Sequence, residues 1–232
     1  MTSIGLFGAS GRMGSAIAEA AADRDDVSIV DEQCDVLIDF SAPEGLEAHL
    51  ETAVETGKPI VIGTTGLTHE HERLIEAAAR KIAVLQAANM SLGVNLLAHL
   101  VLQTAERLGE DWDIEIVEMH HRHKVDAPSG TALLLGQAAA DGRGVSLGEV
   151  SERGRDGITG PRAPGHIGFA SLRGGSVAGD HQLILATEGE RIELGHRAES
   201  RAVFARGAIQ AALWLIGRPA GRYGMTDVLG LA

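Results

Sequence analysis

Short apolar runs alternate with amphipathic segments along the first 90 residues of the chain. Runs typical of buried strands lie at 3–7, 36–40, 59–62 and 82–85, and a segment with helical spacing of its apolar residues follows each run. Ser41-Ala42-Pro43-Glu44 predicts a capping box, with proline in the first turn of a helix that ends at Gly57. Strands that alternate with helices of this length predict parallel βαβ units, and therefore an α/β fold.

The pattern changes after Ser91. A long helix over 92–108 leads to an alternating strand at 112–117, a helix at 129–140, and strand candidates at 166–173, 182–186 and 191–196. Residues 142–165 are rich in Gly, Arg and Pro, which indicates a long surface loop. We expect an α+β domain over 91–200, with two helices on a mostly antiparallel sheet of about four strands. A last helix at 203–216 is expected to return to a first domain formed by 1–90 and 201–232.

Composition limits the kinds of protein that the chain can be. With 232 residues, 44% of them hydrophobic and 22% charged, the chain is long and apolar enough to bury a globular core. Its net charge of −12 argues against a nucleic-acid-binding surface. No apolar run approaches the roughly 20 residues of a membrane span, and the first residues show no signal-peptide pattern. The single cysteine, Cys34, excludes an internal disulfide and fits a location in the reducing cytoplasm.

Three loops at the ends of predicted strands point to a dinucleotide cofactor. Residues 8–14 follow the first strand with the spacing G-x-x-G-x-x-G, which allows a tight turn and a close approach of backbone to pyrophosphate. Each loop alone is also compatible with a plain turn, but in parallel sheets ligands bind at the carboxyl ends of the strands, where these loops converge. The predicted cofactor-binding residues are Gly8, Ala9, Ser10, Gly11, Arg12, Met13, Gly63, Thr64, Thr65, Ala87, Ala88, Asn89 and Met90.

The connection after the short strand candidate at 27–30 is too short for an ordinary nucleotide-binding fold. Only five residues, Asp31-Glu32-Gln33-Cys34-Asp35, separate it from the strand at 36–40, whereas a crossover between parallel strands needs about a dozen or more. We therefore expect a Rossmann-like domain that lacks about one strand-helix unit. Asp31 lies 20 residues after Gly11, near the spacing of a ribose-binding acid, and is interpreted either as such a cofactor contact or as a loop carboxylate.

The segment 118–132 carries the densest chemistry of the chain. It holds His120, His121, His123 and Lys124, followed by Pro128-Ser129-Gly130-Thr131, a turn that opens a helix. Imidazole and ammonium groups bind anions and deliver protons, and the unpaired N–H groups of a helix start suit a carboxylate. A solvated basic loop is the plain alternative. A metal site is disfavoured, because adjacent histidines on a strand point to opposite faces and the one cysteine lies far away.

The chain resembles the 4-hydroxy-tetrahydrodipicolinate reductase family, also called dihydrodipicolinate reductase, from end to end. Glu118–Ala132 is similar at every fixed position to the family signature E-x-H-H-x-x-K-x-D-A-P-S-G-T-A, and 8–14 is similar to the family loop G-x-x-G-R-M-G. Asp39-Phe40-Ser41, Gly63-Thr64-Thr65-Gly66 and Ala88-Asn89-Met90-Ser91 match further motifs, with Met90 where phenylalanine is common. Longer family members have some tens of residues where this chain has 31–35.

The resemblance implies an activity and roles for single residues. Family members reduce a cyclic imine dicarboxylate with hydride from NADH or NADPH, in the diaminopimelate route to lysine, and most are tetramers joined through the sheet of the second domain. By resemblance, His120 and Lys124 handle the proton, while His121, Lys124, Gly130 and Thr131 hold the substrate carboxylates. Ser129, which belongs to the same helix-opening turn, is grouped with the substrate-binding residues, and no metal is implied. From the residues alone, two other functions stay open: a different nicotinamide-dependent reductase or dehydrogenase for a small dicarboxylate, and a non-catalytic nucleotide-binding sensor.

Overall fold

The chain folds into two compact units. The computed structural model describes residues 1–31 and 33–231. Unit 1 comprises Met1–Leu92 with Arg201–Ala232, and unit 2 comprises Gly93–Ser200. Each unit has a sheet and a hydrophobic core of its own. The segment after Ser200 therefore packs with the first part of the chain, although unit 2 separates the two in sequence.

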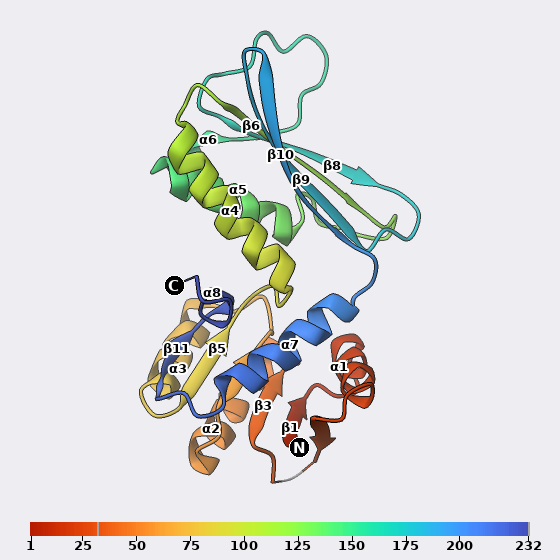
Figure 1. Ribbon diagram of the computed structural model, residues 1–232, viewed down its shortest axis with the longest axis vertical. Coiled ribbons are helices and arrows are strands. Elements are labelled where there is room, and N and C mark those ends of the chain that lie inside the picture. Colours follow the sequence, from red (N-terminus) through yellow and green to blue (C-terminus); the bar gives the residue numbers. More distant parts are fainter. Residues whose placement is uncertain (32, 232) are drawn as a thin grey trace. The chain divides into compact units, whose positions relative to one another are not determined.

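A parallel six-stranded sheet forms the centre of unit 1 (Figure 1). Its strand order is β11-β5-β4-β3-β1-β2, and every neighbouring pair is parallel, which confirms the predicted α/β fold. The strands are β1 (Thr2–Phe7), β2 (Val27–Val30), β3 (Val36–Asp39), β4 (Ile60–Ile62), β5 (Ala83–Gln86) and β11 (Gly221–Tyr223). The helices are α1 (Arg12–Ala22), η1 (Pro43–Gly45), α2 (Leu46–Thr56), α3 (His69–Ala79), α7 (Ala202–Leu215) and α8 (Met225–Val228).

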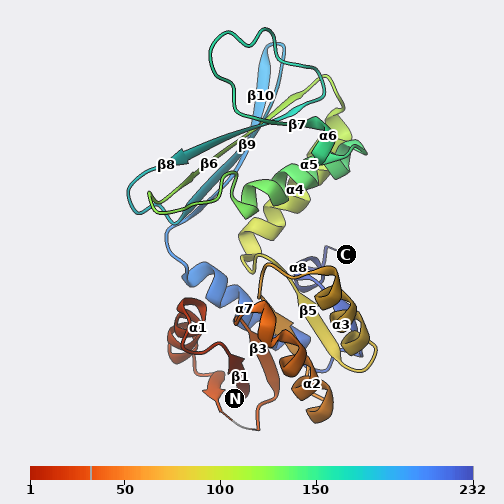
Figure 2. The ribbon, with the colours of Figure 1, turned by 180° about the vertical axis from the view of Figure 1, so that it is seen from behind.

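Helices cover both faces of this sheet. α1 and α7 pack on one face (Figure 1), where Ile17 of α1 and Ile209 of α7 are fully buried in one cluster. α2 and α3 pack on the opposite face, seen from behind in Figure 2, where Leu50 of α2 and Ile75 of α3 are buried in another cluster. A sheet that is covered on both sides explains why its strands are continuous apolar runs rather than alternating ones.

The short connection between β2 and β3 works because the two strands are displaced along β1. β2 pairs with residues 2–5 of β1 and β3 pairs with residues 4–7, so their pairings overlap only at positions 4 and 5. The chain therefore returns by about one or two residues along the strand axis, a distance that five residues span easily. The side chain of Cys34 packs against β1 at Gly5, where the strand has no side chain. A Cβ at Gly5 would lie only 2.8 Å from Cys34 Sγ, so this close packing requires glycine. Asp35 then fastens the connection by accepting a hydrogen bond from the Ser3 N–H (2.8 Å).

The helix after β3 begins differently from the prediction. α2 is preceded by η1, whose N-cap residue is Ala42, and no side-chain cap is present on either element. The Ser41 hydroxyl donates instead to Asp39 Oδ1 (2.6 Å). The predicted capping box is thus wrong, because a nearby carboxylate competes for the hydroxyl. The predicted helix end is confirmed, since Gly57 adopts the left-handed conformation (φ 66°) that closes a helix.

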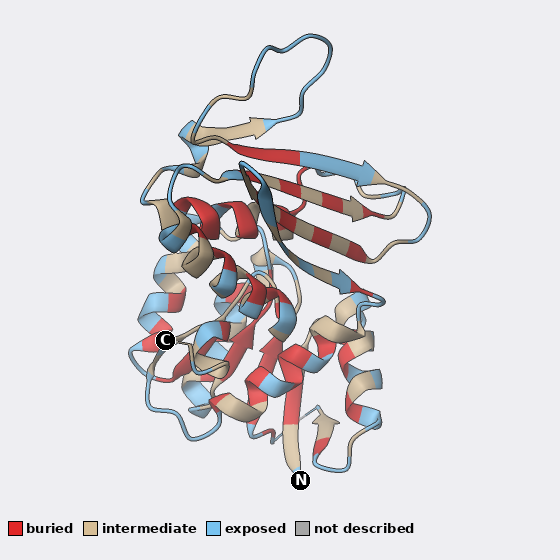
Figure 3. Cartoon of the chain, turned by 45° about the horizontal axis from the view of Figure 1, so that its top comes forward, coloured by how far each residue is buried: buried red, intermediate tan, exposed pale blue. Residues whose placement is uncertain are grey.

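Unit 2 is a five-stranded sheet with helices on one face. Its elements are α4 (Leu92–Leu108), β6 (Asp113–His120), α5 (Gly130–Arg143), α6 (Leu147–Val150), β7 (Ser151–Arg153), β8 (Ile167–Arg173), β9 (Gly179–Thr187) and β10 (Glu190–Ala198), in the strand order β10-β9-β6-β8-β7. Buried and half-buried residues alternate along β6 and β9 (Figure 3), because only one side of these strands packs on the helices.

The prediction of a mostly antiparallel sheet of about four strands needs correction. β9 is antiparallel to β6 and β10, but β8 is parallel to β6, and β7 is parallel to β8. α5 lies in the crossover between β6 and β8, so these strands run in the same direction. The segment 142–165, predicted as one long surface loop, contains the end of α5, the short helix α6 and the fifth strand, β7.

No helix within the described residues is long and apolar enough to cross a membrane. α4, with 17 residues, carries Arg107 in its last turn and buries Leu97 and Val101 against the sheet of unit 2.

Candidate active site

Loops of unit 1 surround a pocket of about 520 Å³ at the carboxyl ends of the parallel strands. The pocket is lined by Gly11, Arg12, Met13, Phe40, Ser41, Gly63, Thr64, Thr65, Ala88, Asn89, Met90 and Phe204. The structure therefore brings together predicted cofactor-binding residues from three loops that are far apart in sequence. Gly8, Ser10 and Ala87 belong to the same loops but do not line the pocket.

The loop at residues 8–14, called the glycine loop here, has the backbone features of a phosphate-binding turn. Gly8 has φ 82°, a conformation that favours glycine, and the Gly11 N–H donates to the Gly8 carbonyl (2.9 Å) to close a tight turn. Within the described chain, α1 has no side-chain cap at its start and no acidic residue in its first turn. Free N–H groups and the positive end of the helix dipole remain there, which suits the pyrophosphate of a dinucleotide.

Ala9 and Asp31 line a different groove, of about 590 Å³. This groove lies along β1, β2 and α2, and its other lining residues are Gly5, Leu6, Phe7, Ile29, Val30, Gln33, Cys34, Leu37, Thr52, Thr56 and Lys58. Among the described residues no helix lies between β2 and β3, and the groove runs along this part of the sheet. Asp31 thus shares a groove with one residue of the glycine loop, but it also shares it with Lys58, a cation that sequence reasoning did not consider.

A buried carboxylate joins two loops of the pocket in unit 1. Asp39, at the end of β3, has no exposed surface, and its Oδ1 accepts hydrogen bonds from the Thr64 hydroxyl (3.0 Å) and the Ser41 N–H (2.9 Å). His49 Nδ1 lies 2.9 Å from Asp39 Oδ2. These bonds fix the loop after β3 against the loop after β4. Sequence reasoning noted Asp39 only as part of a motif, although an acid at the end of an apolar strand was the available signal.

Phe204 on α7 is a lining residue that sequence reasoning missed. α7 approaches the loop after β5 very closely, because a Cβ at Gly207 would collide with the carbonyl oxygen of Met90. The glycine lets the helix backbone rest on this loop and places Phe204, one turn earlier, at the pocket. The signal in the sequence was a glycine inside an otherwise apolar helix, which often marks close packing.

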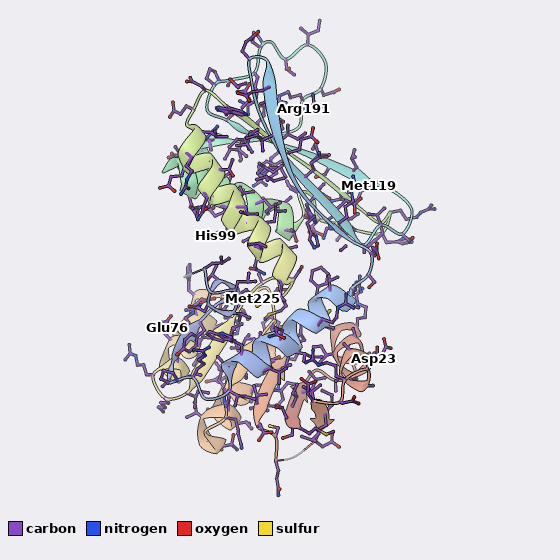
Figure 4. All side chains as sticks on the ribbon, viewed as in Figure 1. Asp23, Glu76, His99, Met119, Arg191 and Met225 are labelled. Atoms are coloured by element: carbon purple, nitrogen blue, oxygen red, sulfur yellow. The ribbon has the colours of Figure 1, made fainter. Side chains whose placement is uncertain are left out.

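The segment rich in histidine and lysine begins inside the sheet of unit 2. β6 extends past its predicted end and includes His120, so Glu118 and His120 share one face of the strand. Met119, labelled in Figure 4, lies between them and belongs to the other face. Glu118 is 1% exposed and His120 is 7% exposed, and His120 Nδ1 lies 2.6 Å from Glu118 Oε2. His120 is thus a buried, carboxylate-bound imidazole rather than a member of a solvated loop.

Arg173 on β8 keeps the Glu118 carboxyl group ionised. Its Nη1 and Nη2 each donate to one carboxylate oxygen at 2.9 Å, and the Ser129 N–H donates to Oε1 at 3.2 Å. Burial raises the pKa of Glu118, but hydrogen bonds from Arg173, His120 and Ser171 outweigh it and hold the pKa at about 2. Glu118 therefore acts as a hydrogen-bond acceptor throughout the neutral pH range.

His181 on β9 faces the same cluster and was missed by sequence reasoning. Its ring stands edge-on to that of His120, with centroids 5.0 Å apart, and its Nε2 lies 2.9 Å from Ser129 Oγ. Burial first, and repulsion from His120 second, lower the pKa of His181 to about 4, so this side chain is neutral at pH 7. A histidine at a core position of an alternating strand was the only signal.

The helix start predicted to bind substrate is the beginning of α5. Ser129 is its N-cap residue, and Ser129 Oγ accepts a hydrogen bond from the Ala132 N–H (3.1 Å). The Ser129 N–H donates to Glu118, so both the N–H and the hydroxyl of this buried residue have hydrogen-bond partners within unit 2. Gly130 and Thr131 form the first turn of α5, and a Cβ at Gly130 would meet no atom within 4 Å.

Lys124 lies in the turn between β6 and α5. Its Nζ pairs with Asp126 Oδ1 at 2.9 Å, and this hydrogen bond lowers the pKa of Asp126. The rings of His121 and His123 lie beside each other, with centroids 6.3 Å apart. Across residues 1–31 and 33–231, no three His, Cys, Asp or Glu side chains are grouped so that they could hold a metal ion.

Family models match almost the whole chain. The model of the dihydrodipicolinate reductase N-terminus matches residues 24–90, and that of the dihydrodipicolinate reductase C-terminus matches residues 93–229. A solved structure, the dipicolinate-bound dihydrodipicolinate reductase from Paenisporosarcina sp. TG-14, is 21% identical with a TM-score of 0.79 and covers 98% of this chain and 99% of its own. This likeness shows that the two proteins share a fold.

Curated relatives match over nearly the full length. The 4-hydroxy-tetrahydrodipicolinate reductase of Zymomonas mobilis subsp. mobilis is 59% identical, over 98% of this chain and 97% of that protein. The protein of the same name from Caulobacter vibrioides is 48% identical, over 98% of this chain and 96% of that protein. Such identity across both units goes well beyond a shared fold, and the chain belongs to the dihydrodipicolinate reductase family.

Proposed function

We propose that the chain reduces 4-hydroxy-tetrahydrodipicolinate to tetrahydrodipicolinate with NADH or NADPH, in the diaminopimelate route to lysine. The names of its curated relatives support this substrate. The observation that carries the proposal is the segment at the end of β6, where His120, Lys124 and the start of α5 combine a buried imidazole, an ammonium group and a helix start. These groups suit a dianionic substrate that must receive a proton.

The chemistry divides between the two units. The pocket of unit 1 would hold the nicotinamide dinucleotide, with its pyrophosphate at the uncapped start of α1; when bound, the nicotinamide supplies a hydride. In unit 2, Lys124 and His121 would attract the substrate carboxylates, and the N–H groups of Gly130 and Thr131 would bind one of them. His120 and Lys124 would deliver the proton that balances the added hydride.

Ser129 takes a supporting part in this proposal. Its N–H and hydroxyl are bound to Glu118, Ala132 and His181, so its contribution to substrate binding is to hold the start of α5 in place.

On the resemblance to the family, we also propose that the protein acts in the cytoplasm as a homotetramer. Its subunits would be joined through the helix-free face of the sheet of unit 2.

The decisive assay follows the consumption of NADH or NADPH when the freshly formed cyclic imine or its hydrated form is added. We expect oxidation of the cofactor that depends on this substrate, with tetrahydrodipicolinate as the product. Cofactor binding without any turnover would favour a nucleotide-binding sensor. Turnover of a different small dicarboxylate, but not of this one, would favour another dehydrogenase.

Removal of the Thr131 hydroxyl is expected to weaken substrate binding. Thr131→Val should raise KM for the dicarboxylate by about 10-fold, the value of a hydrogen bond to a charged group, with a smaller effect on kcat. Pyridine-2,6-dicarboxylate, a planar mimic of the substrate, should compete with it in steady-state kinetics. Thr104→Val is the matched control, since the Thr104 hydroxyl donates to the Leu100 carbonyl of its own helix, at 2.6 Å. Inhibition that competes with the cofactor alone would place the carboxylate site elsewhere.

Asp31 is expected to influence the choice of cofactor. A carboxylate at the ribose end accepts hydrogen bonds from the 2′-OH of NADH and repels the 2′-phosphate of NADPH, so NADH should be at least as good by kcat/KM. Asp31→Ser should shift the ratio toward NADPH, by a modest factor, because Asp31 is exposed and salt screens its charge. Asp25→Ser, at the other end of β2, removes an exposed carboxylate of equal charge and should leave the ratio unchanged. A strong NADPH preference that Asp31→Ser does not alter would contradict the assignment.

A further inference from the structure

Glu118, to which neither the proposed substrate contacts nor the proposed cofactor contacts assign a role, is a buried carboxylate with several hydrogen-bond partners in unit 2. Glu118 accepts hydrogen bonds from both Nη atoms of Arg173 and from the Ser129 N–H, and it lies 2.6 Å from His120 Nδ1. Arg173 is the register partner of His120 across the parallel pair β6–β8. Since Arg173 also donates to the Asp126 carbonyl (2.7 Å), it ties the turn that carries Lys124 to the sheet.

The ionised state of Glu118 determines where His120 carries its proton. A carboxylate accepts hydrogen bonds and cannot donate one, so the nitrogen that faces Glu118 must carry hydrogen. In the neutral imidazole this leaves Nε2 as the nitrogen that can accept a proton, and later return it. The surroundings of Nε2 fit this role, because the residue beside it is Gly179. Any other residue there would place a Cβ only 3.1 Å from Nε2, whereas glycine leaves that space open.

We infer that Glu118, held in place by Arg173, is a positioning residue that fixes the ring and the tautomer of His120 with hydrogen on Nδ1 and Nε2 toward the reaction. This inference rests on the proposed function, in which His120 handles a proton. Glu118 does not contact the reacting atoms; it acts through His120, as a carboxylate that orients a catalytic imidazole does.

A purely structural ion pair between two strands is the alternative. Such a pair would contribute to the stability of unit 2, and its loss would lower the folded fraction without altering the protonation of His120. A positioning residue has a second effect, because replacement by glutamine offers an amide N–H to Nδ1 and so allows hydrogen to move to Nε2. The tautomer of His120 therefore separates the two roles.

The experiment compares the full-length wild type with Glu118→Gln and Glu118→Asp. Nitrogen-15 NMR of labelled, ligand-free protein near neutral pH reports which His120 nitrogen carries hydrogen, with the signal assigned by its loss in His120→Gln. We expect hydrogen on Nδ1 in the wild type and in Glu118→Asp, and a shift toward Nε2 in Glu118→Gln. In steady-state kinetics, Glu118→Gln should lose about 10-fold or more in kcat with KM nearly unchanged, as for a misplaced proton donor, and Glu118→Asp should recover part of the loss.

Glu115→Gln is the matched control. Glu115 lies on the same strand but on the other face, and it pairs with Arg155 and Arg162 at 2.7 and 2.9 Å. This variant loses an arginine-bound carboxylate of unit 2 and should keep the wild-type tautomer and kcat. If Glu118→Gln does not fold, Arg173→Lys, which keeps the charge and loses the paired hydrogen bonds, takes its place with a smaller expected loss.

The outcomes distinguish this inference from the proposed function. Hydrogen on Nε2 of His120 in the wild type would overturn the inference even in a fully active enzyme. Wild-type kcat in folded Glu118→Gln would overturn it as well. A wild type that never turns over the cyclic imine would overturn the proposed function, and the NMR measurement would still show whether Glu118 sets the tautomer.

Discussion

Replacement of His120 or Lys124 by alanine is expected to lower kcat by about 10²-fold or more, the usual contribution of a positioned proton donor. The affinity for NADH or NADPH should stay nearly unchanged, because the pocket predicted to hold the dinucleotide is formed by residues of unit 1 alone. The double variant should lose less than the product of the two single losses, since both residues serve one step. Steady-state kinetics with the cyclic imine, together with fluorescence titration of the cofactor, measure both effects.

Two substitutions of the same residue types act as controls for this pair. Lys81→Ala removes an exposed ammonium group just after α3, and His123→Ala removes an exposed histidine close to Lys124 in sequence. Both should keep wild-type kcat within a few-fold, because neither side chain belongs to the proposed proton path. Full turnover in Lys124→Ala or in His120→Ala would remove that residue from the proton-transfer step.

The stability of unit 2 is expected to fall as the pH drops from 6.5 to 4, and His181 is the cause. Its pKa is about 4 in the folded protein, against 6.5 for an ordinary histidine side chain, because burial and the nearby His120 disfavour the charged ring. Between these values the unfolded chain binds a proton that the folded chain does not, so the free energy of unfolding decreases with decreasing pH. The full loss below pH 4 amounts to about 3 kcal/mol.

His181→Gln should remove this dependence while it retains an acceptor for the Ser129 hydroxyl. Urea unfolding of unit 2 at several pH values, followed by Trp112 fluorescence in a Trp214→Phe background, measures it. From pH 7 to pH 4, the wild type should lose up to about 3 kcal/mol more of its free energy of unfolding than the variant does. His123→Gln, an exposed histidine of the same unit, should show no such change. Parallel pH curves for the wild type and His181→Gln would contradict the assignment.

Local patterns determined the fold class of unit 1 and the position of its pocket. Each parallel strand is buried on both faces, so it appears in the sequence as a short apolar run, and the loops at the carboxyl ends of such strands meet at one edge by geometry alone. Gly8 and Gly57 mark turns that need a positive φ, which few other residues tolerate. The segment 118–132 could also be recognised from the sequence, because its residue types and their spacing are local properties.

Strand pairing in unit 2 was decided by the tertiary structure. Alternating strands have the same appearance whether their neighbours run parallel or antiparallel, so the parallel pairs β6–β8 and β7–β8 left no local signal. The short crossing at Cys34 depends on the register of β2 and β3 along β1, which no single segment contains. The capping box predicted at Ser41 likewise failed for a tertiary reason. The Ser41 hydroxyl donates to Asp39, and the sheet holds this carboxylate within reach.

The sequence by itself determined which residue types are present, the period of each segment and the turns that glycine permits. Only the tertiary structure decided how Glu118 is paired, because its partner Arg173 lies 55 residues away and meets it through the register of two strands. Burial and pKa follow the same rule, since the pKa of His181 falls to about 4 only when the core surrounds its ring. Contacts between distant residues depend on the whole packing arrangement, and the local spacing of side chains carries no record of them.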